Sequence, residues 1–251
     1  MDDVCLILQD LSKSFGGLIA VDHVNLEIRL RERRAIIGLN GAGKTTLFNL
    51  ICGEITPSGG KITHLGKDVT WLPVHKRTAL GIVRTFQITN LFPNLTVLQN
   101  LRLAAQGVER TKYVMHRPIS SFLHLDEQSQ KILAEVGLWE KRDVLVKNLS
   151  HGEQRQIEIS MALIGQPRLL LLDEPTAGLS PAETLSFAAM LKKLDPDMTI
   201  LLIEHDMDVA FTFADHISVL HQGSLVTSGK KEEVKANPIV QEIYLGAEGI
   251  C

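Results

Sequence analysis

The sequence predicts an α/β fold built around a largely parallel sheet, and three observations support this fold class. Short apolar runs alternate with segments of helical spacing along the chain. Two of these runs, 169–172 and 199–203, are rich in Leu and Ile without polar alternation, as in strands that are covered on both faces. A glycine-rich segment separates the strand-like run 35–37 from a helical segment. With 251 residues, the chain can bury a core without disulfide or metal support.

The composition is that of an ordinary globular protein, with 45% hydrophobic and 22% charged residues, which excludes disordered and fibrous classes. The net charge is −3, from 26 Lys and Arg against 29 Asp and Glu. We therefore expect no nucleic-acid binding through bulk charge, and we expect any bound anion to be held by local geometry. The scattered cysteines, Cys5, Cys52 and Cys251, indicate reduced thiols rather than disulfides or a zinc site.

No segment has the pattern of a membrane span or a secretory signal. The chain begins with two acidic residues and a short apolar run that ends before Asp10. The longest uncharged stretch, 85–101, contains several amide side chains and Pro93, so it is not expected to cross a bilayer. We therefore expect a soluble chain that reaches a membrane only through a partner.

The predicted elements fall into three blocks along the chain. The first has strands over 4–8, 24–28 and 35–37, a turn at 15–17, a helix over 44–52 and a hairpin-like stretch over 61–70. The second is mostly helical, with helices over 97–105, 127–136 and 153–164. The third has strands over 169–172, 199–203 and 217–220 and a helix over 181–194. This order predicts a core formed by 1–87 and 166–251 and an inserted helical subdomain over 88–165.

Residues 38–45, GLNGAGKT, match the phosphate-loop pattern G-x-x-x-x-G-K-[ST] between a strand and a helix. The glycines allow backbone N–H groups to face phosphates, and the helix N-terminus favours an anion. Lys44 is expected to reach the β- and γ-phosphates, and the Thr45 hydroxyl to bind Mg²⁺. A glycine-rich turn met by chance is the alternative, at roughly 1% of chains this long. The predicted nucleotide-binding residues of this segment are Asn40, Gly41, Ala42, Gly43, Lys44, Thr45 and Thr46.

Two carboxylates, Asp173 and Glu174, directly follow the apolar run 169–172. Parallel sheets bind ligands beyond the carboxyl ends of their strands, so both acids should lie beside the phosphate loop. We expect Asp173 to hold Mg²⁺ through water and Glu174 to polarise the attacking water. A simple helix cap is the alternative for such an acidic pair.

With these motifs, the sequence resembles the nucleotide-binding subunits of ATP-binding cassette (ABC) transporters over essentially its whole length. Residues 149–154, LSHGEQ, resemble the LSGGQ signature of that family, which begins a helix. The resemblance implies that Ser150 and Gly152 present a hydroxyl and backbone N–H groups to the γ-phosphate held by the opposite subunit. Outside this context, the same residues would indicate a helix cap.

Three further positions match motifs of the family. The resemblance implies that Gln87, in the Q-loop, senses Mg²⁺ and the attacking water, and that His205, the switch histidine, contacts the γ-phosphate. Phe15 stands where the family stacks an aromatic ring on adenine, with core packing as the alternative. The implied catalytic residues are Lys44, Gln87, Glu174 and His205, and the implied Mg²⁺ ligands are Thr45, Gln87 and Asp173. The implied fold is a P-loop NTPase (RecA-like) core with an N-terminal antiparallel β subdomain and an inserted helical subdomain.

The sequence departs from the family pattern at two positions. His151 stands where glycine is usual in the signature, which adds bulk and could add a pH-sensitive contact. Ser180 replaces the usual Asp of the D-loop, residues 177–180, which puts any role of that carboxylate in question. Hydrolysis is still expected, because the implied catalytic groups are all present: Lys44, Asp173, Glu174 and His205.

Residues 73–87, 203–207 and 237–246 are similar to uptake ATPases for branched-chain amino acids and urea. The resemblance implies that ATP and Mg²⁺ bind, that a second ATPase subunit completes a hetero- or homodimer, and that permease subunits and a solute-binding protein are partners. It also implies a peripheral location on the cytoplasmic face of the inner (plasma) membrane. No residue of such a subunit should touch the transported solute, so the sequence does not identify it.

Three alternatives stay open at this stage. The lipopolysaccharide-export ATPase is a close alternative with a different C-terminal region. A soluble ABC ATPase that acts on ribosomes or in iron–sulfur assembly would share the catalytic motifs. A phosphate-loop GTPase or kinase outside the family is disfavoured by the LSHGEQ segment, by His205 and by the lack of a guanine-specific N-K-x-D motif.

Overall fold

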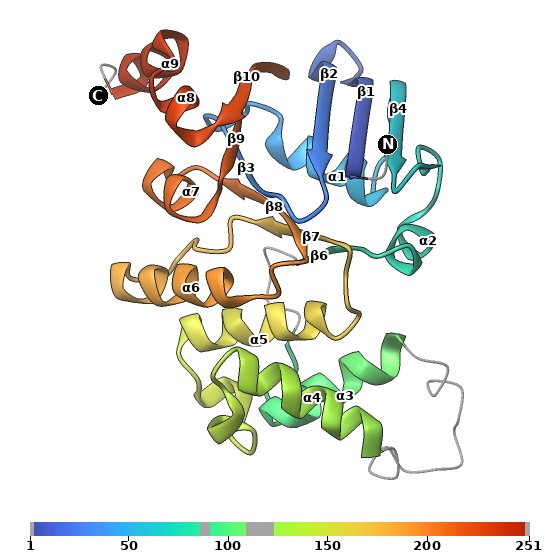
Figure 1. The fold of residues 1–251 in the computed structure, drawn as a ribbon, viewed down its shortest axis with the longest axis vertical. Helices are drawn as coiled ribbons and strands as arrows, with labels where there is room; N and C mark the ends of the chain where they lie inside the picture. The colour runs from blue at the N-terminus through green and yellow to red at the C-terminus, as the bar shows by residue number, and fades with distance from the viewer. Residues whose placement is uncertain (1–2, 86–90, 109–122, 249–251) are drawn as a thin grey trace. The chain divides into compact units, whose positions relative to one another are not determined.

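The computed structural model describes residues 3–85, 91–108 and 123–248, with only the backbone described for 245–248. These residues form two compact units (Figure 1). Unit 1 combines the described parts of Met1–Ile82, Arg168–Glu174 and Pro196–Cys251. Unit 2 combines those of Val83–Pro167 and Pro175–Asp195. The domain limits expected from the sequence remain a prediction.

Unit 1 contains an antiparallel sheet with the strand order β2-β1-β4-β5. Its strands are β1 (Val4–Phe15), β2 (Leu18–Arg29), β4 (Gly59–His64) and β5 (Lys67–Asp68). A tight turn at Gly16 and Gly17 joins β1 to β2, and Gly16 has a φ of 58° that glycine adopts without steric cost. The predicted turn and the hairpin-like stretch over 61–70 are confirmed, whereas β1 and β2 are longer than the predicted strands.

The second sheet has the order β10-β9-β3-β8-β7-β6. Its strands are β3 (Arg33–Ile37), β6 (Ile82–Arg84), β7 (Leu169–Asp173), β8 (Thr199–Glu204), β9 (His216–His221) and β10 (Ser224–Lys230). Strands β9, β3, β8 and β7 are parallel to one another, and β10 pairs antiparallel with β9. Every residue of β7 and β8 is buried, which explains why Leu and Ile follow one another in both strands without polar alternation. The predicted α/β class with a largely parallel sheet is confirmed.

Helix α1 (Lys44–Cys52) packs in the main apolar core of unit 1. Leu47, Phe48 and Ile51 are buried in one cluster with side chains from β1, β2, β4, β7 and β8. Gly53, with a φ of 83°, ends the helix, and its N–H donates to the carbonyl groups of the last turn. The structure confirms both limits of the helix predicted over 44–52.

The other helices described in unit 1 were not predicted. They are α2 (Val74–Ala79), α7 (Met207–Phe213), α8 (Lys231–Lys235) and α9 (Pro238–Glu248). Three of them have seven residues or fewer, which is too short for an apolar periodicity to stand out in the sequence. Strands β6 and β10 were also not predicted.

Two cysteines of unit 1 lie in its interior. Cys5 and Cys52 are buried, and neither is in a disulfide. Burial raises the pKa of the Cys5 thiol to about 11. The expectation of reduced thiols is therefore confirmed for these two residues, whereas Cys251 lies outside the described residues.

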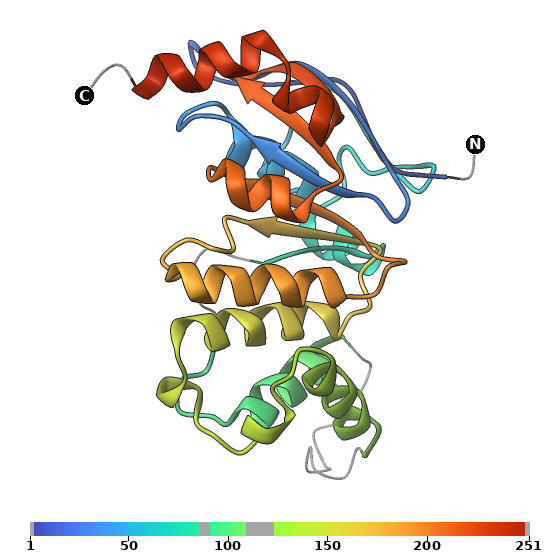
Figure 2. The ribbon, with the colours of Figure 1, turned by 60° about the vertical axis from the view of Figure 1, so that its left-hand side comes forward.

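Unit 2 is predominantly helical. Its helices are α3 (Val97–Val108), α4 (Leu123–Glu135), α5 (His151–Leu163) and α6 (Pro181–Lys193). Arg102 of α3 pairs with Asp126 of α4, with 2.7 Å between Nη2 and Oδ2. Helices α5 and α6 lie side by side in both views (Figures 1 and 2).

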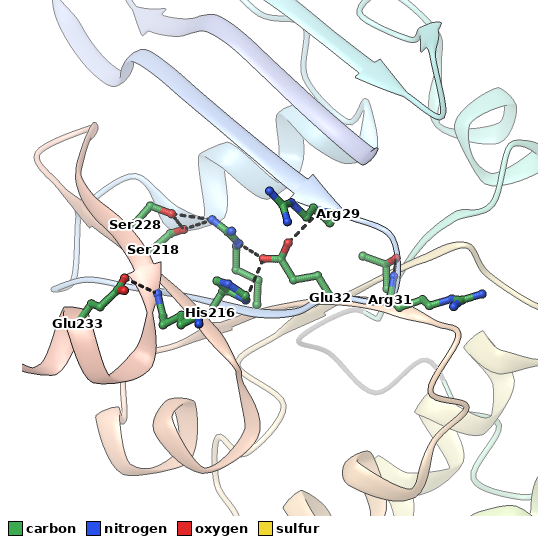
Figure 3. Close-up of polar contacts among 10 residues, drawn as sticks. Arg29, Arg31, Glu32, His216, Ser218, Ser228 and Glu233 are labelled. Atoms are coloured by element: carbon green, nitrogen blue, oxygen red, sulfur yellow. Dashed lines mark hydrogen bonds and ion pairs between the residues drawn. The ribbon is translucent and has the colours of Figure 1, made fainter. Parts of the chain in front are cut away.

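A buried polar cluster joins the start of β3 to β9 and β10 (Figure 3). The Glu32 carboxylate binds the guanidinium of Arg34, and both side chains are less than 10% exposed. Arg34 Nη1 also donates to Ser218 (3.0 Å) and Ser228 (2.6 Å). His216 Nδ1 lies 3.7 Å from the same carboxylate. The charges of this cluster are thus paired within unit 1.

No helix in the described part of the chain is both long and apolar enough to cross a membrane.

Candidate nucleotide-binding site

The phosphate loop, residues 38–43, connects β3 to α1 in unit 1. Its glycines are required by sterics, because a Cβ at Gly38 would lie 2.2 Å from the Leu220 carbonyl oxygen. A Cβ at Gly43 would lie 2.2 Å from the carbonyl oxygen of Ala20. Gly41 and Gly43 have φ values of 80° and 99°, in the left-handed region. The loop therefore lies in close contact with the backbone of β2 and β9. No side chain caps the N-terminus of α1.

Lys44, the first residue of α1, turns its amine back onto this loop. Its Nζ donates to the carbonyl oxygens of Gly38 (2.6 Å) and Leu39 (3.1 Å), and the residue is only 5% exposed. Burial lowers the pKa of Lys44, whereas the nearby carboxylates of Glu174 and Asp173 act in the opposite direction. The predicted lysine and the two predicted acids therefore share one electrostatic environment.

Three strand ends meet at this edge of the parallel sheet. In register, Ile37 of β3 pairs with Glu204 of β8, and Asp173 of β7 pairs with Ile203 of β8. The phosphate loop, Glu174 and His205 directly follow these strand ends. Because the strands run in the same direction, the structure brings the three predicted segments together at one edge.

Asp173 and Glu174 differ in exposure and conformation. Asp173 is fully buried at the end of β7, whereas Glu174 is partly exposed. Glu174 has a φ of 41°, which a non-glycine residue rarely adopts, and its N–H donates to Ile203 (3.0 Å). Backbone strain of this kind is often found at functional sites.

The His205 side chain is 57% exposed, which suits a group that contacts a ligand. Its Nδ1 lies 3.9 Å from the buried carboxylate of Glu204. The next residue, Asp206, caps α7 by accepting hydrogen bonds from Asp208 and Val209. This cap was not predicted, although an Asp before a helical segment is an ordinary N-terminal signal.

A cavity of about 860 Å³ lies beside the phosphate loop within unit 1. Residues 38–40 and 205–208 form one part of its wall, and Lys235, Val240, Gln241 and Tyr244 form the other. Burial raises the pKa of Tyr244 to about 12, so its phenol is neutral at physiological pH. The contribution of the C-terminal helices to this cavity was not predicted from the sequence.

Phe15 ends β1 and is 49% exposed. Its ring is contacted by Lys13, whose Nζ lies 5.0 Å from the ring centre. This exposure contradicts the alternative of core packing and leaves the ring available for stacking on a base.

In unit 2, the signature segment forms the N-terminus of α5. Ser150 is the N-cap: its hydroxyl accepts from the Glu153 N–H (3.3 Å), and its own N–H donates to the Glu153 carboxylate (3.1 Å). The Gly152 N–H donates to Glu183 Oε1 (3.1 Å). The helix cap and the predicted phosphate contact therefore use the same residues.

The donor set at the sheet edge suits a small divalent cation. Thr45 is exposed in the first turn of α1, and Asp173 is a buried carboxylate close enough to Lys44 to influence its pKa. Hydroxyl and carboxylate oxygens are ligands that Mg²⁺ prefers. Gln87, the third predicted ligand, lies outside the described residues. Among the residues that the structure describes, no cluster of three or more His, Cys, Asp or Glu forms a separate metal site.

Comparison with known proteins agrees with this geometry. A family model described as ABC transporter matches residues 21–177. The high-affinity branched-chain amino acid transport ATP-binding protein BraF of Pseudomonas aeruginosa is 38% identical and covers 96% of this chain and 97% of its own. LivG of Salmonella typhimurium, which has the same description, is 39% identical, with coverages of 98% and 99%.

Solved structures give the same result. An ATP-binding cassette of an ABC transporter in its ADP conformation has a TM-score of 0.85 at 30% identity, and covers 97% of this chain and 99% of its own. A dimeric cassette in a post-hydrolysis state, bound to ADP and Pi, has a TM-score of 0.73 at 26% identity, with coverages of 90% and 98%. The chain therefore belongs to the ABC transporter family as an ATP-binding cassette. Like the other members of that family, it is an ATPase.

Proposed function

We propose that this protein is the ATP-hydrolysing subunit of an ABC importer for branched-chain amino acids. The catalytic part of this proposal rests on one observation. The phosphate loop, Asp173–Glu174 and His205 lie together at one edge of the sheet. The solute class is supported by BraF and LivG, which are similar to this chain over nearly its whole length.

In the proposed site, the phosphates of ATP lie against the N–H groups of the phosphate loop and the N-terminus of α1. Lys44 exchanges its contacts with the loop carbonyls for contacts with the β- and γ-phosphates. Glu174 accepts a proton from the attacking water, and His205 orients the γ-phosphate. Phe15 stacks on the adenine. Asn40, Gly41, Ala42, Gly43 and Thr46 complete the phosphate contacts.

Thr45 and Asp173, together with Gln87, would hold Mg²⁺. The bound ion would neutralise part of the charge on the transferring phosphoryl group. Asp173 is suited to this role because it is buried, lies close enough to Lys44 to influence the pKa of that lysine, and is fixed by its position in β7.

The site requires a second cassette, homologous or identical. Ser150 and Gly152 of one subunit would face the γ-phosphate bound to the other. Two ATP molecules would thus hold the pair closed, and hydrolysis would open it. The binding energy of ATP would shift the transporter between two conformations.

The other proposed partners are two permease subunits, which would hold the chain at the cytoplasmic face of the membrane, and a solute-binding protein. The test is uptake of radiolabelled leucine by cells that lack the chain. We expect uptake to be lost, restored by the wild-type chain and not restored by the Glu174→Gln variant. Proline uptake serves as the control. Unchanged leucine uptake in cells lacking the chain would refute the proposed solute class.

A further inference from the structure

Helices α5 and α6 lie side by side in unit 2 (Figure 2), and Glu183 connects their N-termini. It is the third residue of α6, and its Oε2 accepts hydrogen bonds from the N–H (3.0 Å) and the hydroxyl (2.8 Å) of the N-cap, Ser180. Its Oε1 points to α5 and accepts from the Gly152 N–H (3.1 Å). One carboxylate therefore accepts hydrogen bonds from both the signature segment and the D-loop.

This carboxylate is ionised at any physiological pH. The Ser180 N–H, the Ser180 hydroxyl and the Gly152 N–H lower the pKa of Glu183 to about 2, and the Ser150 hydroxyl adds to the effect. A negative charge is also favoured where it meets a helix N-terminus, and here it meets two. The signature segment thus holds a permanent anion from its own chain.

The absence of a side chain at Gly152 permits this contact. A Cβ on Gly152 would lie 3.1 Å from Glu183 Oε1 and 3.2 Å and 3.3 Å from its Cγ and Cβ. These distances are tighter than ordinary van der Waals contact. Packing against Glu183 within unit 2 therefore favours glycine at position 152, independently of any ligand.

One donor that holds Glu183, the Gly152 N–H, is also one that the proposed function gives to the incoming γ-phosphate. The other, the Ser150 hydroxyl, contributes to the low pKa of Glu183. A single N–H can be shared by two acceptors, but a carboxylate and a phosphate at hydrogen-bond distance from it would repel each other strongly in a partly dehydrated interface. The two anions are thus competitors for Gly152 and Ser150.

We propose that Glu183 is an internal anion that occupies the signature of this cassette until the γ-phosphate held by the opposite cassette displaces it. The inference rests on the proposed function. It makes Glu183 a positioning residue that opposes closure of the ATP-bound pair.

Displacement of Glu183 has a consequence for the D-loop. The carboxylate that releases Gly152 also caps Ser180, the last residue of that loop. A shift of Glu183 therefore alters the hydrogen bonds at the start of α6. Because Ser180 replaces the usual D-loop Asp in this chain, Glu183 supplies the carboxylate at the junction of the D-loop and α6.

The test measures ATP-driven association of two cassettes in a Glu174→Gln background, which slows hydrolysis. Glu183→Gln keeps the size of the side chain and removes its charge. We expect this variant to reach half-maximal association, followed by analytical ultracentrifugation, at a several-fold lower ATP concentration. The difference should shrink at high salt, because charge repulsion is screened.

Glu233→Gln is the matched control. Glu233 has the same place in α8, where its carboxylate accepts from the N–H of the N-cap, Lys230 (3.2 Å). We expect no change in the ATP requirement for this variant. If the Glu174→Gln background does not associate with ATP, the proposed function fails and this inference with it. If that background associates and Glu183→Gln needs the same or more ATP, only the inference fails.

A second measurement keeps Glu183 itself unaltered, so it does not depend on the folding of the Glu183→Gln variant. The ¹³C resonance of the Glu183 carboxyl, in protein labelled at Glu Cδ, should shift when ATP drives association. An unchanged resonance in the associated pair would overturn the proposed displacement.

Discussion

Lys44 Nζ lies 2.6 Å from the carbonyl oxygen of Gly38, so the lysine of the phosphate loop closes a ring with the first residue of that loop. The amine is buried and its pKa is lowered, so a negatively charged partner would stabilise its charged form. Binding of phosphates would replace neutral acceptors with charged ones.

Lys44→Ala is accordingly expected to weaken ATP binding by about a hundredfold, because charge-assisted hydrogen bonds to a buried phosphate are worth roughly 1.5–3 kcal/mol. Titration with a fluorescent ATP analogue measures the affinity. Lys61→Ala, at an exposed lysine that pairs with Asp68, should bind as the wild type does. An affinity of Lys44→Ala within threefold of the wild type would refute the role of Lys44.

Glu174→Gln should reduce steady-state ATP hydrolysis by about 10²–10⁴-fold and leave ATP affinity within a few-fold of the wild type. The amide keeps the shape of the side chain but cannot accept the proton. Phosphate release is the measurement, and Glu232→Gln, at an exposed glutamate of α8, is the control. Near-normal turnover of Glu174→Gln would rule out a general base at this position.

Phe15→Ala should weaken nucleotide binding several-fold without lowering thermal stability, because the ring is half-exposed and stacking on a base is worth roughly 1–3 kcal/mol. Phe15→Trp should retain the affinity. Phe92, which is 51% exposed in unit 2, supplies a matched control as Phe92→Ala. Unchanged affinity in Phe15→Ala would show that adenine does not stack there.

Arg34→Met should lower the free energy of unfolding by about 3–5 kcal/mol, because it leaves the buried Glu32 carboxylate without its partner. Urea denaturation measures this change. Arg31→Met removes an exposed pair with Asp197 and should cost no more than about 1 kcal/mol. Equal costs for the two variants would show that the buried cluster does not contribute as described.

His64 should make the folded state less stable at mildly acidic pH. Burial lowers the pKa of His64 below 6.5, although the carbonyl groups of Leu80 and Cys5, both at hydrogen-bond distance from its ring, partly oppose this. Between the folded pKa and 6.5, the unfolded chain binds the proton more readily, so the free energy of unfolding falls as pH falls.

Urea denaturation at pH 7.5 and at successive values down to pH 5 tests this, with His64→Gln expected to lose part of the pH dependence. His23 provides the contrasting case. Its hydrogen bond with Asp10 raises its pKa, so its contribution is present at low pH and is lost as pH rises through the folded pKa. His23→Gln should therefore steepen the acid-side loss, and an unchanged slope in His64→Gln would contradict the role of His64.

Local signals in the sequence predicted much of the fold and of the site in unit 1. The helix over 44–52 was predicted with both of its limits, because a glycine loop precedes it and Leu47, Leu50 and Ile51 have helical spacing. The strands β7 and β8 were predicted because burial on both faces leaves runs of Leu and Ile without polar alternation. Short helices such as α7 left no comparable periodicity.

The link between Gly152 and Glu183 could not be predicted from the sequence. The S-x-x-E pattern from Ser180 to Glu183 is a capping-box signal, and it would have indicated the start of α6. The sequence offers no sign that the second carboxylate oxygen contacts α5, because that contact depends on how the two helices pack. The cavity wall formed by α8 and α9 was missed for the same reason.

The burial of Cys5 and Cys52 makes the chain convenient for site-specific labelling. Solvent hardly reaches either thiol, and the pKa of Cys5 is also raised, so both should react slowly with maleimides. With Cys251 replaced by Ser, a cysteine introduced at the exposed Leu185 of α6 would be the preferred site for a fluorophore. The emission of that dye would report, in real time, structural changes at the start of α6, where Ser180 and Glu183 are hydrogen-bonded.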